Sequence, residues 1–166
     1  KHDPQAEPGS ADSYLCLGPG WANTCCSPFR YQKVWEHEGG ISSPLIVHWP
    51  AGIQGRGEIR HTPVHFIDFI PTFVELAGGS VATHKAGPPL PGKSIVPCYP
   101  RDTDLGRDYL FFENRGYGGF RAIRQGNLKL VASHDEPWAL YDVATDRCEM
   151  NDLASQMPDK ALELSA

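Results

Sequence analysis

The residues best suited to chemistry gather early in the sequence. Lys33 precedes Glu38-Gly39-Gly40 by five residues, and His37 stands directly before the glutamate. An ammonium held in place stabilises negative charge that develops in a transition state more than charge already present in a ground state. Two successive glycines let the backbone turn where a Cβ atom would clash. Lys33 is therefore a candidate catalytic cation, with a solvated surface lysine as the alternative, and Glu38, Gly39 and Gly40 are candidates for a structural role beside it.

Other side chains near this block are candidates for substrate contact. His37 could bind substrate, although a lone histidine is more often structural. Trp21 could wall a pocket with its indole, and Arg30 could pair with an acidic group, but packing against the loop is the commoner role for both. Glu38 could hold Lys33 or the bend through hydrogen bonds, or be a surface carboxylate. These alternatives stay open at the level of sequence.

The composition excludes several classes of function. With 40% hydrophobic residues, 21% charged residues and a net charge of −5, the chain is typical of a globular protein rather than a disordered one. It lacks the basic stripe that nucleic acid binding requires, and no apolar run approaches the ~20 residues of a membrane span. The five cysteines show no spacing suited to zinc, so buried or partly paired thiols are favoured over a metal site.

The first hundred residues are predicted to form an α/β piece. Residues 1–32 indicate a loop, and residues 41–49 are an apolar, β-branched run that predicts a buried strand. Two helical segments follow around residues 64–70 and 71–77, the second opened by Pro71 and stopped by Gly78. The proline-rich stretch 79–106 is a candidate domain boundary.

Residues 101–166 are predicted to form a small C-terminal antiparallel β subdomain with a helix. Short strand patterns occur at residues 109–112, 120–124, 128–131 and 138–141, with turn sequences between them at the spacing of an antiparallel sheet. Residues 158–164 indicate the start of a helix. The predicted fold class is therefore α/β, with the domains divided at residue 100.

Several blocks of sequence resemble one known family, in that family's order. They are Gly18-Pro-Gly-Trp-Ala-Asn23, Lys33, Glu38-Gly-Gly-Ile41, Pro44-Leu-Ile-Val-His-Trp-Pro50, Val64-His-Phe-Ile-Asp-Phe-Ile-Pro-Thr72, Arg121-Ala-Ile-Arg124 and Glu149-Met-Asn-Asp-Leu-Ala154. Together they resemble the C-terminal part of the arylsulfatase-type sulfatases, from about residue 14 to the end. One such block would be weak, but several in register are a specific signal.

The resemblance implies the C-terminal portion of an alkaline-phosphatase-like sulfatase fold and a sulfuric ester hydrolase activity. In that fold, residues 1–100 would be the incomplete C-terminal end of the large α/β catalytic domain. By resemblance, Lys33 contacts the sulfate and the leaving group of a sulfated small molecule or carbohydrate. Asn114 stands where relatives approach the substrate, although those relatives often have histidine there. His65 and Asp68 fall in a motif that relatives use for helix packing and capping.

The resemblance also implies calcium and formylglycine, and neither is encoded in this segment. Cys26-Ser-Pro-Phe-Arg30 matches the minimal C-x-P-x-R pattern of a formylglycine site, but it occupies the place of a different family segment, so we predict no formylglycine at Cys26. Family metal ligands lie upstream, so we predict no metal ligand in this chain. The partner would be the missing N-terminal sulfatase segment, and the chain alone is predicted to be inactive.

Two other functions were weighed against the hydrolase. A non-catalytic remnant or interaction module of the same fold is the main alternative. Phosphoester hydrolysis on a related fold is less favoured, because the Lys33 to Gly40 block is typical of sulfatases. The sequence does not indicate the compartment, and the family is often secreted, periplasmic or lysosomal.

Overall fold

The structure is a computed structural model, and it describes residues 3, 5–13, 16–55, 57–81, 87–116, 118–133 and 135–166. The chain divides into two compact units. Unit 1 comprises Lys1–Pro44 with Phe111–Ala166, and unit 2 comprises Leu45–Leu110. Each unit is described by itself.

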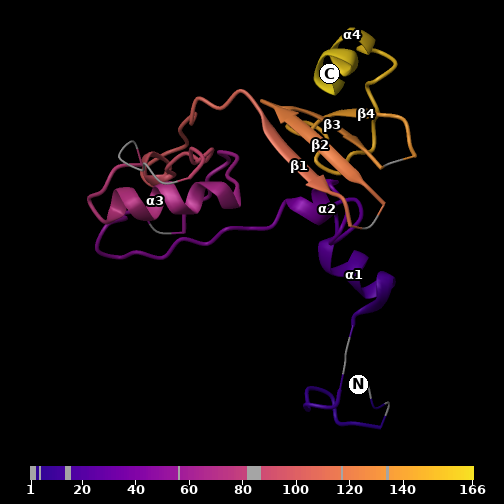
Figure 1. Cartoon of the computed structure of the whole chain (residues 1–166), viewed down its shortest axis with the longest axis horizontal. Helices are drawn as coiled ribbons and strands as arrows, with labels where there is room; N and C mark the ends of the chain where they lie inside the picture. Colours follow the sequence, from indigo (N-terminus) through magenta and orange to yellow (C-terminus); the bar gives the residue numbers. More distant parts are fainter. Residues whose placement is uncertain are drawn as a thin grey trace. The chain divides into compact units, whose positions relative to one another are not determined.

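Unit 1 is built on a four-stranded antiparallel sheet in the order β1-β2-β3-β4 (Figure 1). Its strands are β1 Leu110–Asn114, β2 Phe120–Gln125, β3 Leu128–Ala132 and β4 Ala139–Asp142. Ile123 pairs with Leu130, which in turn pairs with Leu140. The predicted antiparallel subdomain is confirmed, and its strands begin and end within two residues of the predicted positions.

Both faces of this sheet are buried at its centre. On one face, Leu130 and Leu140 pack against Leu164 of helix α4, which spans Pro158–Ser165. On the other face, Val131 and Tyr141 pack with Ala122 and Val143. Figure 1 shows α4 and helix α2 on opposite sides of the strands. A strand covered on both faces needs no alternation of apolar and polar residues, which explains the nearly continuous burial of β3.

Two short helices precede the sheet in unit 1. Helix α1 spans Gly18–Cys26 and α2 spans Glu38–Ile41. The prediction that residues 1–32 are all loop was wrong for α1. Pro19 lies at the first turn, where its missing N–H has no cost, and this was the signal for a helix start. No residue of α1 is buried, so no apolar periodicity marked it.

Unit 2 is organised around the carboxylate of Asp68. The 3-10 turn η1, Phe66–Asp68, leads into helix α3, Phe69–Leu76, and a second turn, η3, spans Val96–Cys98. Asp68 accepts from the backbone N–H groups of His65 (2.8 Å) and Lys93 (2.9 Å), and it pairs with Arg107. His65 accepts in return from Ile67, so the two residues form a capping box. The capping role expected for His65 and Asp68 is present.

The apolar segment 41–49 is not a strand in the structure. Residues 42–49 are irregular, and Leu45, Ile46, Val47 and Trp49 are exposed, Ile46 to 88%. A strand exists only where a neighbour completes its hydrogen bonds, and no strand of the described residues pairs with this segment. The prediction of a buried strand there was wrong for this chain by itself.

The two units do not divide at residue 100. Residues before Pro44 belong to the same compact unit as the sheet, because residues of the α2 region bond to side chains of β3 and of the segment after β4. The assignment of residues 1–100 to the end of a larger catalytic domain stays a prediction. Within the described residues, no helix has both the length and the apolar character needed to cross a membrane.

Leu130→Ala should destabilise the chain, because Leu130 is fully buried between Leu140 and Leu164. Removing a buried leucine side chain typically costs about 2–5 kcal/mol of the free energy of unfolding. Leu162→Ala is the matched control, since Leu162 is 70% exposed, and it should change that free energy by less than about 0.5 kcal/mol. Urea denaturation of both variants measures the difference, and equal losses would contradict the assignment of the core.

Candidate functional site

Lys33 lies in a tight turn of unit 1. The backbone N–H of Trp35 donates to the carbonyl of Gln32 at 3.2 Å, which closes the turn around Lys33. The lysine side chain is exposed and forms no hydrogen bond or ion pair with the residues that the structure describes. Its ammonium is therefore a charge that none of the described residues neutralises.

The diglycine is packed directly against this turn. A Cβ atom on Gly39 would lie 2.1 Å from the carbonyl oxygen of Tyr31, and one on Gly40 would lie 1.8 Å from that of Trp35. Real Cβ atoms do not approach backbone so closely, so only glycine fits at either position. The N–H of Gly39 also donates to the carbonyl of Arg30 at 3.0 Å. The first residues of α2 thus pack directly against the backbone of the Lys33 turn.

Glu38 belongs to a buried ionic cluster that the sequence did not reveal. Lys129 of β3 is fully buried, and its Nζ lies 3.0 Å from Glu38 Oε1 and 2.8 Å from Glu149 Oε1. The backbone N–H of Glu38 donates to Glu149 Oε2 at 2.8 Å. Arg147, half exposed, approaches Glu38 from the rim at 3.7 Å. Glu38 therefore contacts Lys129 and not Lys33.

Two buried carboxylates near Lys129 have pKa values raised by desolvation. Burial raises the pKa of Glu149, although the nearby Lys129 ammonium opposes the rise. Burial also raises the pKa of Glu36, again against the attraction of Lys129. The Lys129 ammonium is thus the positive charge that offsets the burial of several carboxylates. Without it, their negative charges would be buried and uncompensated.

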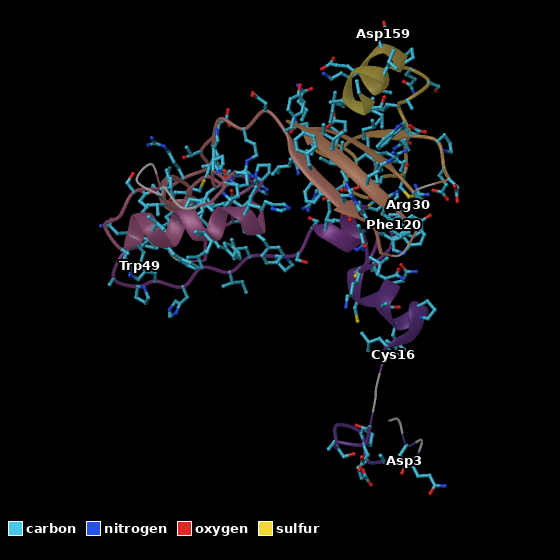
Figure 2. All side chains as sticks on the ribbon, viewed as in Figure 1. Asp3, Cys16, Arg30, Trp49, Phe120 and Asp159 are labelled. Carbon is cyan, nitrogen blue, oxygen red and sulfur yellow. The ribbon has the colours of Figure 1, made fainter. Side chains whose placement is uncertain are left out.

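Arg30 ties the loop before Lys33 to the same region. Its Nη1 donates to the hydroxyl of Tyr141 at 3.0 Å and to the carbonyl of Glu149 at 3.2 Å, and Figure 2 shows it beside the sheet. The guanidinium is thus engaged by protein groups. Of the two roles considered for Arg30, packing against the loop and pairing with an acidic group, the structure shows the packing role.

His37 is buried, with 5% of its surface exposed, and its ring meets the ring of Tyr31 edge-on at 4.7 Å. Burial, together with the nearby positive charges of Lys129 and Arg30, lowers the pKa of His37 to about 3. The imidazole is therefore neutral at physiological pH. Its Nδ1 has no hydrogen-bond partner among the described residues, so the substrate-binding role stays a prediction.

The remaining candidates lie apart from one another. Trp21 is on α1 with 68% of its surface exposed. Asn114 ends β1 and is half-buried, and its Nδ2 donates to the carbonyl of Val34 at 3.2 Å. Asn114 is thereby joined to the residue that follows Lys33. Nothing in the sequence indicated this contact, because the two residues are 80 positions apart.

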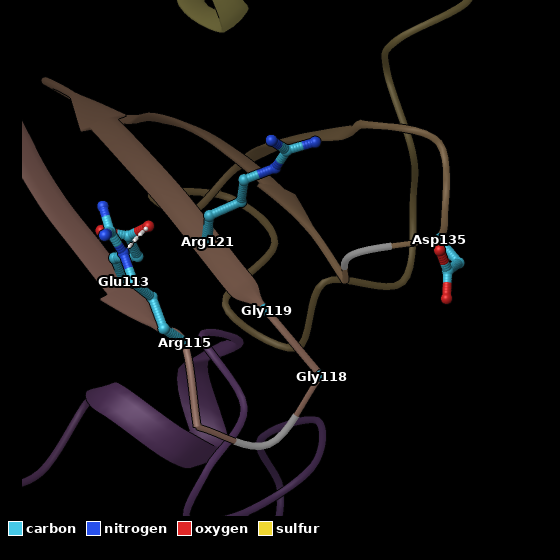
Figure 3. A pocket seen from close by; sticks show the side chains of 6 residues that line it. All are labelled: Glu113, Arg115, Gly118, Gly119, Arg121 and Asp135. Atoms are coloured by element: carbon cyan, nitrogen blue, oxygen red, sulfur yellow. Dashed lines mark hydrogen bonds and ion pairs between the residues drawn. The ribbon is translucent and has the colours of Figure 1, made fainter.

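A shallow pocket of about 400 Å³ opens beside β1 and β2 (Figure 3). Arg115 and Glu113 form an ion pair of 2.8 Å at its edge, and the guanidinium of Arg121 lies 4.5 Å from the centre of the Trp138 ring. The lining residues are Glu113, Arg115, Gly118, Gly119, Arg121 and Asp135. Two arginines are balanced by two carboxylates, so the pocket has no marked preference for anions. Lys33 and His37 are not among its lining residues.

The described residues do not provide a metal site. No group of three or more His, Cys, Asp or Glu side chains among them could hold an ion. The thiols of Cys16, Cys25, Cys26, Cys98 and Cys148 are free, and Cys26 lies at the end of α1. The residues present do not supply the set of hard oxygen ligands that calcium requires.

A family profile described as N-sulphoglucosamine sulphohydrolase, C-terminal, matches residues 29–164. The match begins just before Lys33 and includes the whole sheet. This chain belongs to the sulfatase family. It corresponds to the C-terminal part of that family, as its resemblance had indicated.

Individual sulfatases agree with this assignment. An uncharacterised sulfatase of Schizosaccharomyces pombe is 33% identical over 94% of this chain, and a sulfatase of Formosa agariphila is 30% identical over 81%. The crystal structure of Ps i-CgsB superposes with a TM-score of 0.70 and 26% identity over 83% of this chain. The chain spans only 29%, 26% and 30% of these three proteins, respectively.

Gly40→Ala should disrupt the turn behind Lys33, because the new Cβ would overlap the carbonyl of Trp35. Overpacking of this kind typically costs about 1–3 kcal/mol of the free energy of unfolding. Gly20→Ala is the control, since nothing lies within 4 Å of its Cβ position on α1, and it should stabilise by up to about 1 kcal/mol. Thermal melts compare the two, and an unaffected Gly40→Ala chain would contradict the geometry.

His37 should make the chain sensitive to acid. The pKa of His37 is lower in the folded chain, about 3, than its ordinary value of 6.5, so the native state binds fewer protons. Above pH 6.5 this histidine does not reduce the free energy of unfolding. As the pH falls from 6.5 towards 3, the unfolded chain takes up the proton first, and the free energy of unfolding decreases.

We expect the free energy of unfolding to fall more between pH 7 and pH 4.5 in the natural chain than in His37→Gln. The raised pKa of Glu149 acts in the opposite direction in both proteins, so the difference between them reports His37. Denaturation at the two pH values measures it. Equal losses in both proteins would show that His37 is not held neutral by its surroundings.

Proposed function

We propose that this chain is part of a sulfuric ester hydrolase, to which it contributes the Lys33 segment and the C-terminal subdomain. The nucleophile would come from another part of the protein. The observation that carries the proposal is the exposed ammonium of Lys33, which no described residue neutralises although the turn around it is fixed. An exposed ammonium without a described protein partner, carried on a restrained backbone turn, is available to bind an anion.

The chemistry gives this cation a role. When a sulfate ester is cleaved, negative charge gathers on the sulfuryl oxygens and on the leaving oxygen. An ammonium placed beside them stabilises the transition state more than the ground state, and so raises kcat. Lys33 would hold the sulfuryl group and the leaving oxygen in this way. Glu38, Gly39 and Gly40 would support the turn and not touch the substrate.

Calcium and formylglycine are proposed to belong to the rest of the protein. No group of three or more His, Cys, Asp or Glu side chains among the described residues could hold an ion. We propose that the formylglycine precursor is a cysteine elsewhere in the protein and not Cys26. When bound, calcium would help to bind and polarise a sulfate group. The residues of this chain would bind the substrate's anionic end and shape the wall beside it.

Unit 2 has apolar surface suited to receiving the remainder of the protein. Helix α3 is apolar on several sides, and Phe66, Ile70 and Phe73 are more than half exposed. Helices of that kind are normally buried. The segment 45–49 also exposes its apolar side chains. We propose that the N-terminal sulfatase segment covers these surfaces and pairs with the segment 45–49.

The substrate is proposed to be a sulfated small molecule or carbohydrate. The name of the matching family, N-sulphoglucosamine sulphohydrolase, supports an N-sulfated sugar as one possibility within that class. A further structure of Ps i-CgsB contains k-i-k-neocarrahexaose, which supports a carbohydrate. His37 and Trp21 are proposed as contacts to the substrate.

Lys33→Ala in the complete gene product should lower kcat on an aryl sulfate by roughly 10²–10³-fold, the loss typical when one group that stabilises transition-state charge is removed. Lys160→Ala is the control, because Lys160 also lies in unit 1 but pairs with the exposed Glu163 on α4. The kcat of the Lys160→Ala variant should be unchanged. The 166-residue chain alone should show no turnover.

Two results would contradict the proposal. A complete gene product with no activity on any sulfate ester would favour the non-catalytic module. Full activity in Lys33→Ala would show that another residue stabilises the sulfuryl group.

A further inference from the structure

The backbone around Lys33 is held in a conformation that side chains normally avoid. Tyr31 has a φ of 61° and Val34 a φ of 95°. A positive φ is uncommon for any residue with a Cβ atom, and for a β-branched residue such as valine it is a genuine outlier. Conformations of this kind persist only where the surrounding structure over-determines them. The contacts that restrain Val34 are therefore also the contacts that orient Lys33.

Aromatic rings restrain the turn on either side of Lys33. The ring of Trp35 stacks on that of Tyr31, with centroids 4.2 Å apart and planes within 14° of parallel. The same indole lies 4.4 Å from the ring of Phe120, the first residue of β2. The rings of Tyr31 and Trp35 thus hold the two ends of the turn together, and Trp35 also packs against the sheet. The N–H of the peptide between Val34 and Trp35 already donates to the carbonyl of Gln32 at 3.2 Å, which leaves the carbonyl of Val34 as the group of that peptide still to be restrained.

Asn114 supplies the missing restraint. Its Nδ2 donates to the carbonyl of Val34 at 3.2 Å, and its Oδ1 accepts from the N–H of Gly116 at 3.0 Å. Both ends of the amide therefore bond to backbone, one to the Lys33 turn and the other to the turn that follows β1. The strand β1 fixes Asn114, and Asn114 in turn fixes the peptide directly after Val34.

We propose that Asn114 is a positioning residue for Lys33. By holding the carbonyl of Val34, it keeps the turn in the strained conformation from which the ammonium meets the sulfuryl group. This inference rests on the proposed function. It differs from the substrate contact that the resemblance implied for Asn114, because the amide acts through the backbone and not on the substrate.

Asn114→Asp tests the proposal in the complete gene product. The aspartate has nearly the same shape and can still accept from Gly116, but when ionised it cannot donate to Val34. We expect kcat to fall about 10-fold with little change in KM, because a displaced catalytic group can cost up to about 10²-fold. Gln156→Glu is the matched control, since it makes the same amide-to-acid change at an exposed position of unit 1 and should leave kcat unchanged.

A double-mutant cycle with Lys33→Ala separates positioning from other roles. If Asn114 acts through Lys33, adding Asn114→Asp to Lys33→Ala should lower kcat no further. Asn114→Ser, which shortens the side chain without adding charge, should give the same pattern. Circular dichroism of each variant at the assay temperature confirms that the comparison is between folded proteins.

The outcomes distinguish this inference from the proposed function. If Lys33→Ala lowers kcat but the effects of the two substitutions multiply, or Asn114→Asp and Asn114→Ser raise only KM, Asn114 does not position Lys33. The same conclusion follows if both Asn114 variants keep full kcat. If Lys33→Ala itself leaves kcat unchanged, the proposed function fails, and the inference fails with it.

Discussion

The buried ammonium of Lys129 is the interaction on which the arrangement of unit 1 depends. It lies on the inner strand β3, without access to solvent, and joins Glu38 of α2 to Glu149, which follows β4. A buried ion pair adds little net stability compared with an apolar pair, but removing one partner leaves the other charges uncompensated, at a cost of several kcal/mol. The cluster therefore specifies where α2 rests on the sheet more than it strengthens the fold.

The position of the Lys33 turn follows from that constraint. Once Glu38 is fixed, Gly39 and Gly40 follow immediately, and their missing Cβ atoms let α2 press against the backbone of residues 30–35. Asn114 restrains the turn from β1, and the ring of Trp35 restrains it from β2. Lys33 is then left with an ammonium that pairs with no described residue of this region. Three strands of the sheet thus contribute to the placement of a side chain that lies about 80–100 residues before them in the sequence.

The sequence predicted the local features well, since these depend on neighbouring residues. The four strands, helix α4 and the capping residues His65 and Asp68 all follow from turn residues, strand composition and motif order. The partners of Lys129 and Asn114 could not be predicted, because a lysine within Leu128-Lys-Leu-Val131 has the pattern of an outward-facing residue. Only the sheet register and the covering of its second face show that Lys129 is buried. The segment 41–49 failed as a predicted strand for a related reason, because its composition is that of a strand but its pairing partner is not among the described residues.

Lys129 holds the Lys33 segment on the sheet, and native-state hydrogen exchange tests this role most directly. In the natural chain, the amides of Gly39, Gly40 and Ser42 donate to the carbonyls of Arg30, His37 and Glu38, and they should be protected. In Lys129→Met, these amides should lose protection while those of the β2–β3 pair keep most of theirs, because local opening would free α2 before the sheet unfolds. Unchanged protection of Gly39 and Gly40 in a folded Lys129→Met chain would contradict the account.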